Sequence, residues 1–280
     1  MVVNGSASDA LLERARARIK RWTPTEAFAP RYHTLRRHRA NSWASPRASA
    51  LDRADPTCGR GPMNWSAPGD EQSCGMAAPK LGGWDPFTPN EVAQVMRQAG
   101  VRWWVSGGWA IDLSIGHQTR PHDDIDIGVF RSDQEQIQRF FADWDVVIAN
   151  NGRLRPWPAG KWLATPNNDL WIRDRRDGPW RIQIMLNDGG GDTWVSRRDL
   201  SIRVPCDDAI RVADGIPFLA PHLQLLFKAS APRPKDEADF VATIGCLTPR
   251  ERIWLENHIR DLNARHLWLS QLRGASRLHR

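Results

Sequence analysis

The chain is organised around residues 101–130, which read VRWWVSGGWAIDLSIGHQTRPHDDIDIGVF. An apolar run leads through Ser106-Gly107-Gly108 into a short helical pattern, and the segment ends in an alternating strand that carries Asp124 and Asp126. Successive side chains of a strand point to opposite faces, so the two aspartates share one face and the apolar residues around them share the other. The segment predicts a sheet strand with one packing face and one carboxylate face.

The carboxylate face predicts a metal site, because Mg2+ is commonly held by one or two carboxylates plus substrate phosphates. Solvent-facing carboxylates are the alternative, but strands are depleted in Asp. Gly107 and Gly108 lie where a strand expected at 101–105 turns into a helix expected at 109–115. Glycine lets the backbone approach a ligand closely, and the amides at a helix start favour anions. We therefore predict that Ser106, Gly107 and Gly108 cradle phosphates beside a metal on Asp124 and Asp126.

Two glycines, a helical segment and Asp-hydrophobic-Asp-hydrophobic resemble the signature of the nucleotidyltransferase superfamily with a DNA-polymerase-beta-like core. Residues 107–130 resemble more narrowly the aminoglycoside-2''-adenylyltransferase and lincosamide nucleotidyltransferase branch, and the resemblance extends over about 89–261, including the downstream PFLAPHLQLLFKASAPRPKDEADF. It implies an enzyme that uses Mg2+ and ATP, acts on a small hydroxylated acceptor and is associated with antibiotic resistance.

The resemblance also implies a third acid on a neighbouring strand, as a metal ligand or as the base for the acceptor hydroxyl. The expected strand at 180–188, WRIQIMLND, has Gln183 at that place, and an amide cannot take a proton. Asp188 is the candidate replacement, although strand parity puts it on the face opposite Gln183 unless a bulge intervenes. Asp192 is an alternative. Without a replacement, the protein would be slow, would pass the proton to phosphate or water, or would have lost transfer activity.

Four further residues are candidates for nucleotide or phosphate binding. Arg120 and His122 lie in the link before Asp124; Arg120 would pair with phosphate or an acidic neighbour, and His122 would bind or serve as a structural hydrogen-bonding residue. Lys228 and Lys235 belong to KASAPRPKDEADF, a segment that resembles one recurrent in this branch. A surface ion pair between Lys235 and Asp239 explains that spacing equally well.

Local signals predict an α+β fold, a nucleotidyltransferase-like mixed sheet flanked by helices. Thr88-Pro-Asn-Glu91 and Ser132-Asp-Gln-Glu135 predict helix starts, and alternating segments at 144–149, 169–173 and 180–186 predict strands. Residues 188–192 are expected to form a flexible loop, followed by short strands near Trp194 and Ile202. Helices are expected at 221–229, 235–244 and 248–262. We place the catalytic core at 81–205 and a mainly helical part at 206–280.

The first 80 residues differ in character from the rest. They hold 13 of the 39 Lys and Arg but only 7 of the 32 Asp and Glu, so most of the net charge of +7 lies there. Few apolar residues recur at the spacing of a helix or of a strand, which predicts a disordered basic extension. A start placed too far upstream, with Met76 or Met63 as the alternative, would also explain this composition.

The nearly neutral remainder argues against a nucleic-acid substrate, which needs a basic surface. No apolar run approaches the ~20 residues of a membrane helix, and four separated cysteines suit a reducing compartment, so we expect a cytoplasmic protein without membrane contact.

The predicted reaction moves a nucleoside monophosphate, AMP from ATP, to a hydroxyl of an aminoglycoside or similar small molecule. The alternatives are a protein-adenylylating enzyme of toxin-antitoxin type, with a protein partner as acceptor, and a nucleotide-binding module without catalysis. A tRNA-type nucleotidyltransferase is disfavoured by the neutral core.

Overall fold

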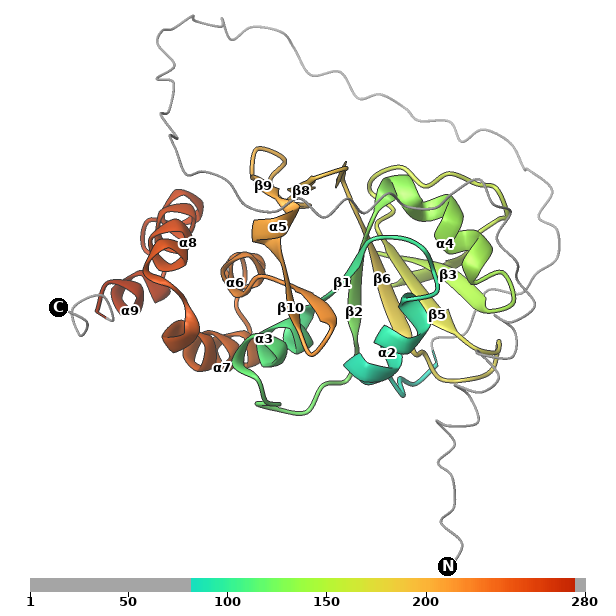
Figure 1. The fold of residues 1–280 in the computed structure, drawn as a ribbon, viewed down its shortest axis with the longest axis horizontal. Helices are drawn as coiled ribbons and strands as arrows, with labels where there is room; N and C mark the ends of the chain where they lie inside the picture. The colour runs from blue at the N-terminus through green and yellow to red at the C-terminus, as the bar shows by residue number, and fades with distance from the viewer. Residues whose placement is uncertain (1–81, 275–280) are drawn as a thin grey trace, which may run out of the picture. The chain divides into compact units, whose positions relative to one another are not determined.

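The computed structural model describes residues 82–274 of the chain (Figure 1). The helices are α2 (Pro89–Met96), α3 (Gly107–Ile115), α4 (Gln134–Phe140), α5 (Cys206–Ala209), α6 (Pro221–Ala229), α7 (Pro234–Thr243), α8 (Pro249–Leu262) and α9 (Trp268–Gly274). The strands are β1 (Trp103–Ser106), β2 (Asp126–Phe130), β3 (Asp145–Asn150), β4 (Arg153–Pro156), β5 (Asp169–Arg173), β6 (Ile182–Asn187), β7 (Gly189–Gly190), β8 (Thr193–Val195), β9 (Arg203–Pro205), β10 (Ile210–Ala213) and β11 (Ile216–Leu219).

Eight strands form one mixed sheet in the order β10-β11-β1-β2-β6-β5-β3-β4. The pairs β1–β11 and β2–β6 are parallel, and the other neighbours are antiparallel. A smaller antiparallel sheet joins β7, β8 and β9. The mixed sheet with flanking helices confirms the predicted fold class.

Alternation along the strands divides the sheet into two faces. On one face, the buried side chains of Val105, Ile127 and Ile184 pack in one core with residues of α2 and with Ile137 of α4. On the opposite face, Trp104 and Phe130 pack with residues of β8, α5 and α6. Asp126 shares this second face with them by strand parity, as predicted from the alternating pattern. The cluster on the first face contains more buried apolar residues than the cluster on the second.

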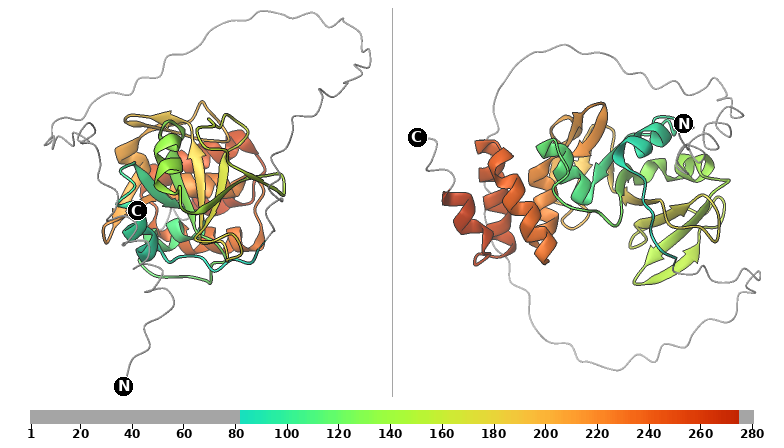
Figure 2. Two further views of the ribbon diagram at one scale, coloured as in Figure 1. Left: turned by 90° about the vertical axis from the view of Figure 1, so that its right-hand side faces the viewer. Right: turned by 90° about the horizontal axis from the view of Figure 1, so that it is seen from below.

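A third core holds the C-terminal helices together at one end of the described fold (Figure 2). Ile111 of α3, Leu225 of α6, Phe240 of α7 and Leu255 of α8 are all buried in it. Helix α3 therefore belongs to both parts, because it begins at the end of β1 and packs against α6 and α7. A rigid connection of this kind fixes the residues at the start of α3 relative to those of α6 and α7.

Local capping signals explain where several helices begin. Thr88 and Thr248 each form a capping box with the glutamate three residues later, as the Thr-Pro-x-Glu pattern predicts. The second predicted start differs, because residues 131–133 form a short 3-10 helix before α4 and Asp133 makes no capping hydrogen bond.

Three strands of the large sheet are absent from the sequence-based expectation, namely β4, β10 and β11. The last two lie beyond residue 205, so the sheet continues past the predicted boundary between core and helical part. The expected loop at 188–192 contains β7, which pairs with β8. The extension predicted at 1–80 and both alternative starts lie outside the described residues. No helix between residues 82 and 274 is long and apolar enough to cross a membrane.

Candidate active site

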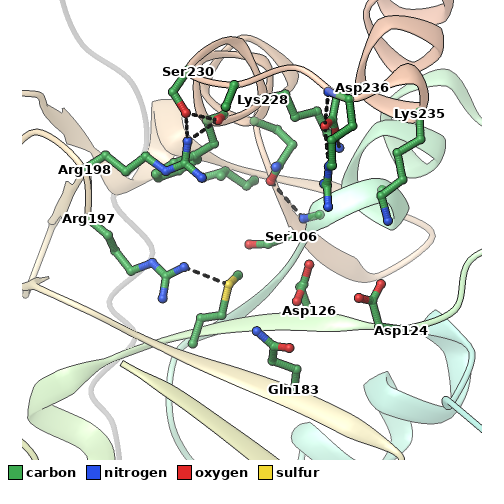
Figure 3. A pocket seen from close by; sticks show the side chains of 18 of the residues that line it. Ser106, Asp124, Asp126, Gln183, Arg197, Arg198, Lys228, Ser230, Lys235 and Asp236 are labelled. Carbon is green, nitrogen blue, oxygen red and sulfur yellow. Dashed lines mark hydrogen bonds and ion pairs between the residues drawn. The ribbon is translucent and has the colours of Figure 1, made fainter. Parts of the chain in front are cut away.

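Asp124 and Asp126 line one cavity of about 350 Å3 at the end of the second sheet face (Figure 3). Strand β2 begins only at Asp126, so Asp124 lies in the preceding segment and not in the strand itself. Asp126 pairs in register with Ser106 on one side and with Gln183 on the other. Three neighbouring strands therefore present their polar residues in one row, above which the cavity opens.

The two aspartates have the electrostatics of a cation site. Burial, and next the charge of Asp124, raise the pKa of Asp126 to about 7. Two carboxylates this close disfavour each other's charge, and a divalent cation between them removes that cost. The described part of the chain holds no group of three or more His, Cys, Asp or Glu that would bind a metal alone. A two-carboxylate site of this kind fits Mg2+ that is also held by substrate phosphates.

The glycines leave space for the aspartate and for the link that follows α3. Gly107 has φ of +68°, and a Cβ there would lie 2.3 Å from Oδ2 of Asp126. A Cβ on Gly108 would lie 2.5 Å from both Arg120 and His122. Both positions therefore require glycine for close approach, and Gly107 also requires it for its backbone conformation.

Ser106, Gly107 and Gly108 line the cavity, as predicted for a phosphate cradle. The Gly107 N–H is engaged, however, because it donates to Oε1 of Gln224 at 2.9 Å. Ser106 makes no side-chain capping bond to α3, so its hydroxyl is not committed to the helix. Gln224 was missed by the sequence reasoning, and it fixes α6 to the start of α3.

Lys228 is at the centre of a buried charge cluster. Its ammonium lies 2.9 Å from Asp236 and 2.7 Å from Asp239, while Arg120 donates twice to Asp239 at 2.9 and 3.0 Å. Arg233 donates to Asp236 at 2.8 Å. Burial acts to raise the pKa of both aspartates, but these cationic donors outweigh it and hold each pKa below its usual range. Arg120 and Lys228 line the cavity, yet each is ion-paired, which agrees with the acidic-neighbour alternative for Arg120.

His122 serves as a buried hydrogen-bonding residue and does not line the cavity. Its Nδ1 lies 3.1 Å from Nη1 of Arg120, and its Nε2 lies 2.5 Å from Oδ2 of Asp112. A guanidinium can only donate, so Nδ1 accepts and Nε2 carries the proton that is donated to Asp112. Thr119 fixes Asp112 in turn through its backbone and hydroxyl donors. The predicted nucleotide-binding role is therefore replaced by one of positioning Arg120.

Lys235 lines the same cavity and extends toward Asp124 (Figure 3). It forms no hydrogen bond or ion pair with any residue in the range 82–274, so the alternative of a surface ion pair with Asp239 is not found. Asp239 is instead occupied by Arg120 and Lys228. An unpaired ammonium beside two carboxylates and an open cavity is suited to bind phosphate.

Asp188, the candidate third acid, points away from the cavity. Its Oδ1 accepts from Nε of Arg131 at 2.7 Å, and it is not among the lining residues. Strand parity explains this placement, since Gln183 faces the cavity from β6 and Asp188 lies at the opposite parity. The prediction of a catalytic Asp188 is corrected accordingly. Asp192 lies on the exterior, 3.7 Å from Arg102 and 99% exposed.

Gln183 is held by a tryptophan. Nε1 of Trp171 donates to Oε1 of Gln183 at 3.1 Å. An indole nitrogen only donates, so the carbonyl end of the amide faces Trp171 and the NH2 end remains for other partners. In this orientation Gln183 offers donors to its surroundings and neither a metal-binding oxygen nor a base.

Sequence reasoning missed the residues that form the far side of the cavity. Arg197 donates to Asp169 at 2.8 Å and to Sδ of Met185 at 3.2 Å. Arg198 donates to the Phe227 carbonyl at 2.5 Å and to Ser230. Asp169 lies on β5 opposite Met185, and parity puts it on the same sheet face as Gln183. The consecutive arginines were the one local signal for this group.

Residues 90–160 match the family model described as Aminoglycoside-2''-adenylyltransferase, and no curated protein matches the sequence. Similar solved structures include the lincosamide antibiotic adenylyltransferase LnuA with lincomycin bound, at 17% identity and a TM-score of 0.40, covering 56% of this chain and 94% of that one. ANT(2")-Ia in complex with adenylyl-2"-tobramycin is similar at 14% identity and a TM-score of 0.40, and the match covers 61% of this chain and 92% of that one. An antigenic nucleotidyltransferase-like protein from Paracoccidioides brasiliensis is similar at 15% identity and a TM-score of 0.39, and the match covers 65% of this chain and 88% of that one. The family match spans both glycines and both aspartates and confirms the predicted resemblance.

Proposed function

We propose that this chain, whose residues 90–160 resemble the aminoglycoside-2''-adenylyltransferase branch of the nucleotidyltransferases, moves AMP from ATP to a hydroxyl of a small molecule with Mg2+. The observation that carries the proposal is the row of Ser106, Asp126 and Gln183 that lines one cavity, with Asp124 beside it. The family match supports an enzyme that modifies an antibiotic-like acceptor. The donor base, the metal and the acceptor are parts of the proposal.

Asp124 and Asp126 would hold Mg2+, which would neutralise charge on the triphosphate and on the departing pyrophosphate. Lys235 contributes a positive charge at the same end of the cavity, where no carboxylate neutralises it among the described residues. Gly107 leaves the space that the Asp126 carboxylate occupies, so the metal site can form directly beside the start of α3. Together these groups hold the α-phosphorus in place for attack.

The acceptor oxygen forms a bond to the α-phosphorus while the bond to pyrophosphate breaks, and the hydroxyl proton leaves. Gln183 cannot take that proton. Asp169 does not line the cavity itself, but it lies on the same sheet face and is bound to Arg197, which does; it would receive the proton from an acceptor bound on that side. We propose Asp169 as the base in place of Asp188.

Pyrophosphate release tests the function. The full-length chain is incubated with ATP, Mg2+ and a panel of hydroxylated antibiotics, and the product is identified by mass spectrometry. We expect release that depends on one acceptor and falls by about 10³-fold in Asp124→Asn and in Asp126→Asn. Asp123→Asn is the matched control, because Asp123 is exposed and does not line the cavity.

Two other outcomes have distinct signatures. Adenylylation of a co-purifying protein, with no small acceptor used, would favour the toxin-antitoxin type of enzyme. Binding of ATP and Mg2+ without any release would favour a binding module, and the amide of Gln183 in place of an acid is the observation that keeps this candidate. An Asp169→Asn variant that retains full activity would exclude Asp169 as the base.

A further inference from the structure

The charges around the cavity are unequal. The lining includes three carboxylates, Asp124, Asp126 and Asp236, and six cationic side chains, Arg120, Arg197, Arg198, Lys228, Arg233 and Lys235. A site built for a polycation presents carboxylates to it, because complementary charges in a cleft attract the ligand and like charges suppress its binding. The signs of the lining charges therefore indicate which charge the acceptor can carry.

Each carboxylate in or beside the lining is either ion-paired within the chain or assigned to the proposed metal. Asp236 accepts from Lys228 and Arg233. Asp169, which lies beside the cavity, is paired with Arg197 at 2.8 Å. Only Asp124 and Asp126 remain, and the proposed reaction assigns them to the metal. No unpaired carboxylate of the described lining is left for an ammonium group of an acceptor.

The far side of the cavity, away from Asp124 and Lys235, carries a positive charge without a counter-ion (Figure 3). Arg198 forms no salt bridge with a described carboxylate, and its partners are the Phe227 carbonyl and the Ser230 hydroxyl. Burial and the neighbouring charge of Arg197 lower the pKa of Arg198, which is the direction expected for an uncompensated cation. Met185 and Phe227 give this side its apolar surface.

We infer that the acceptor bound beside Arg198 is an uncharged or anionic hydroxylated molecule, and not a polycation of the aminoglycoside type. The inference rests on the proposed function and narrows its acceptor. An ammonium group of a polycation bound there would face Arg198, a cation without a counter-ion, and would find no unpaired carboxylate as a partner. Like charges placed together in this way strongly disfavour binding.

Tobramycin is the probe for this exclusion. The full-length chain is first loaded with Mg2+ and the α,β-methylene analogue of ATP, which blocks transfer, and tobramycin is then titrated calorimetrically. We expect no saturable binding of tobramycin below about 1 mM. In Arg198→Glu, which reverses the charge on the far side, we expect binding to strengthen by about tenfold or more.

Arg153→Glu is the matched control, since it makes the same charge change on the exposed edge strand β4 and lies outside the cavity lining. Arg198→Gln serves if the glutamate variant does not fold. Micromolar binding of tobramycin to the unaltered chain would overturn the inference, and so would a charge reversal that leaves tobramycin binding absent.

The loading step separates this inference from the proposed function. If the ATP analogue does not bind, or binds equally to Asp124→Asn, the nucleotidyltransferase proposal fails. If the analogue binds, and tobramycin is adenylylated when ATP replaces the analogue, the function stands and only the acceptor class is wrong.

Discussion

Gly107 is the residue on which the geometry of the site depends most directly. Its positive φ turns β1 into α3, and the missing side chain leaves room for the carboxylate of Asp126. Gly116 has a positive φ as well, at the C-terminus of α3, but a Cβ there would meet nothing within 4 Å. The two glycines separate the cost of backbone strain from the cost of displacing the aspartate.

Gly107→Ala and Gly116→Ala are each expected to lose about 1 kcal/mol of stability through the left-handed backbone. Only Gly107→Ala should also lower pyrophosphate release, by about 10²-fold, because a displaced Asp126 misplaces the metal. Thermal unfolding and initial rates measure the two effects. Equal activity in the two variants would contradict the role given to Gly107.

Much of the site was predictable at this scale, and the limit has a physical cause. The glycines and the two aspartates lie within one segment, so their spacing and strand parity were visible in the sequence. Asp169, Arg197 and Gln224 come from three distant segments and meet only when the sheet and α6 are assembled. Asp188 would have needed a bulge to reach the face of Gln183, and it keeps the opposite parity and pairs with Arg131 instead.

At the scale of the elements, the pairing of β1 with β2 includes a close packing contact between Trp104 and Gly128. A Cβ on Gly128 would lie 2.2 Å from the indole of Trp104, which packs across β2 and against Phe130. The buried indole therefore occupies the space of the missing side chain. Such a contact fixes the pairing of the two strands that carry Ser106 and Asp126.

Gly128→Ala should cost about 1–3 kcal/mol through overpacking against Trp104. Combined with Trp104→Ala, which alone should cost about 3–5 kcal/mol, the total should be less than the sum, since the large side chain no longer opposes the added methyl. Denaturant unfolding of the single and double variants gives the coupling. Gly245→Ala is the control, because a Cβ there meets nothing within 4 Å.

Element prediction succeeded where a local signal was sufficient. Capping boxes located the starts of α2 and α8, and alternation located β5 and β6. The hairpin of β10 and β11 was missed because both strands have only four residues and follow a segment read as the beginning of a helical part. The turn at Asp214-Gly215, where both residues have positive φ, was an available hairpin signal.

At the scale of the whole molecule, Glu251 joins the helical part to the sheet. It caps α8 through Thr248, accepts from Arg211 on β10 and lies 3.0 Å from His222 of α6. Burial acts to raise the pKa of Glu251, but His222 and Thr248 outweigh it and hold the pKa at about 2. The ionised form is therefore favoured more strongly in the folded chain than in the unfolded chain.

This depressed pKa predicts stability that is present above the unfolded value of 4.5 and lost as the pH falls toward 2. Glu251→Gln should lower the unfolding free energy at neutral pH and flatten its decline between those values. Unfolding midpoints measured across the range test this. Glu135→Gln, at an exposed ion pair with Arg139, should change the profile little.

The parallel pairing of β1 with β11 has a consequence for biosynthesis. Strand β1 ends at Ser106, but its parallel neighbour β11, at 216–219, is synthesised more than a hundred residues later. Until then its free edge is a template for wrong partners, so we expect the incomplete chain to be prone to aggregation. A chain that stops after residue 205 should accordingly be recovered as aggregate, whereas one that stops after residue 274 should be recovered folded.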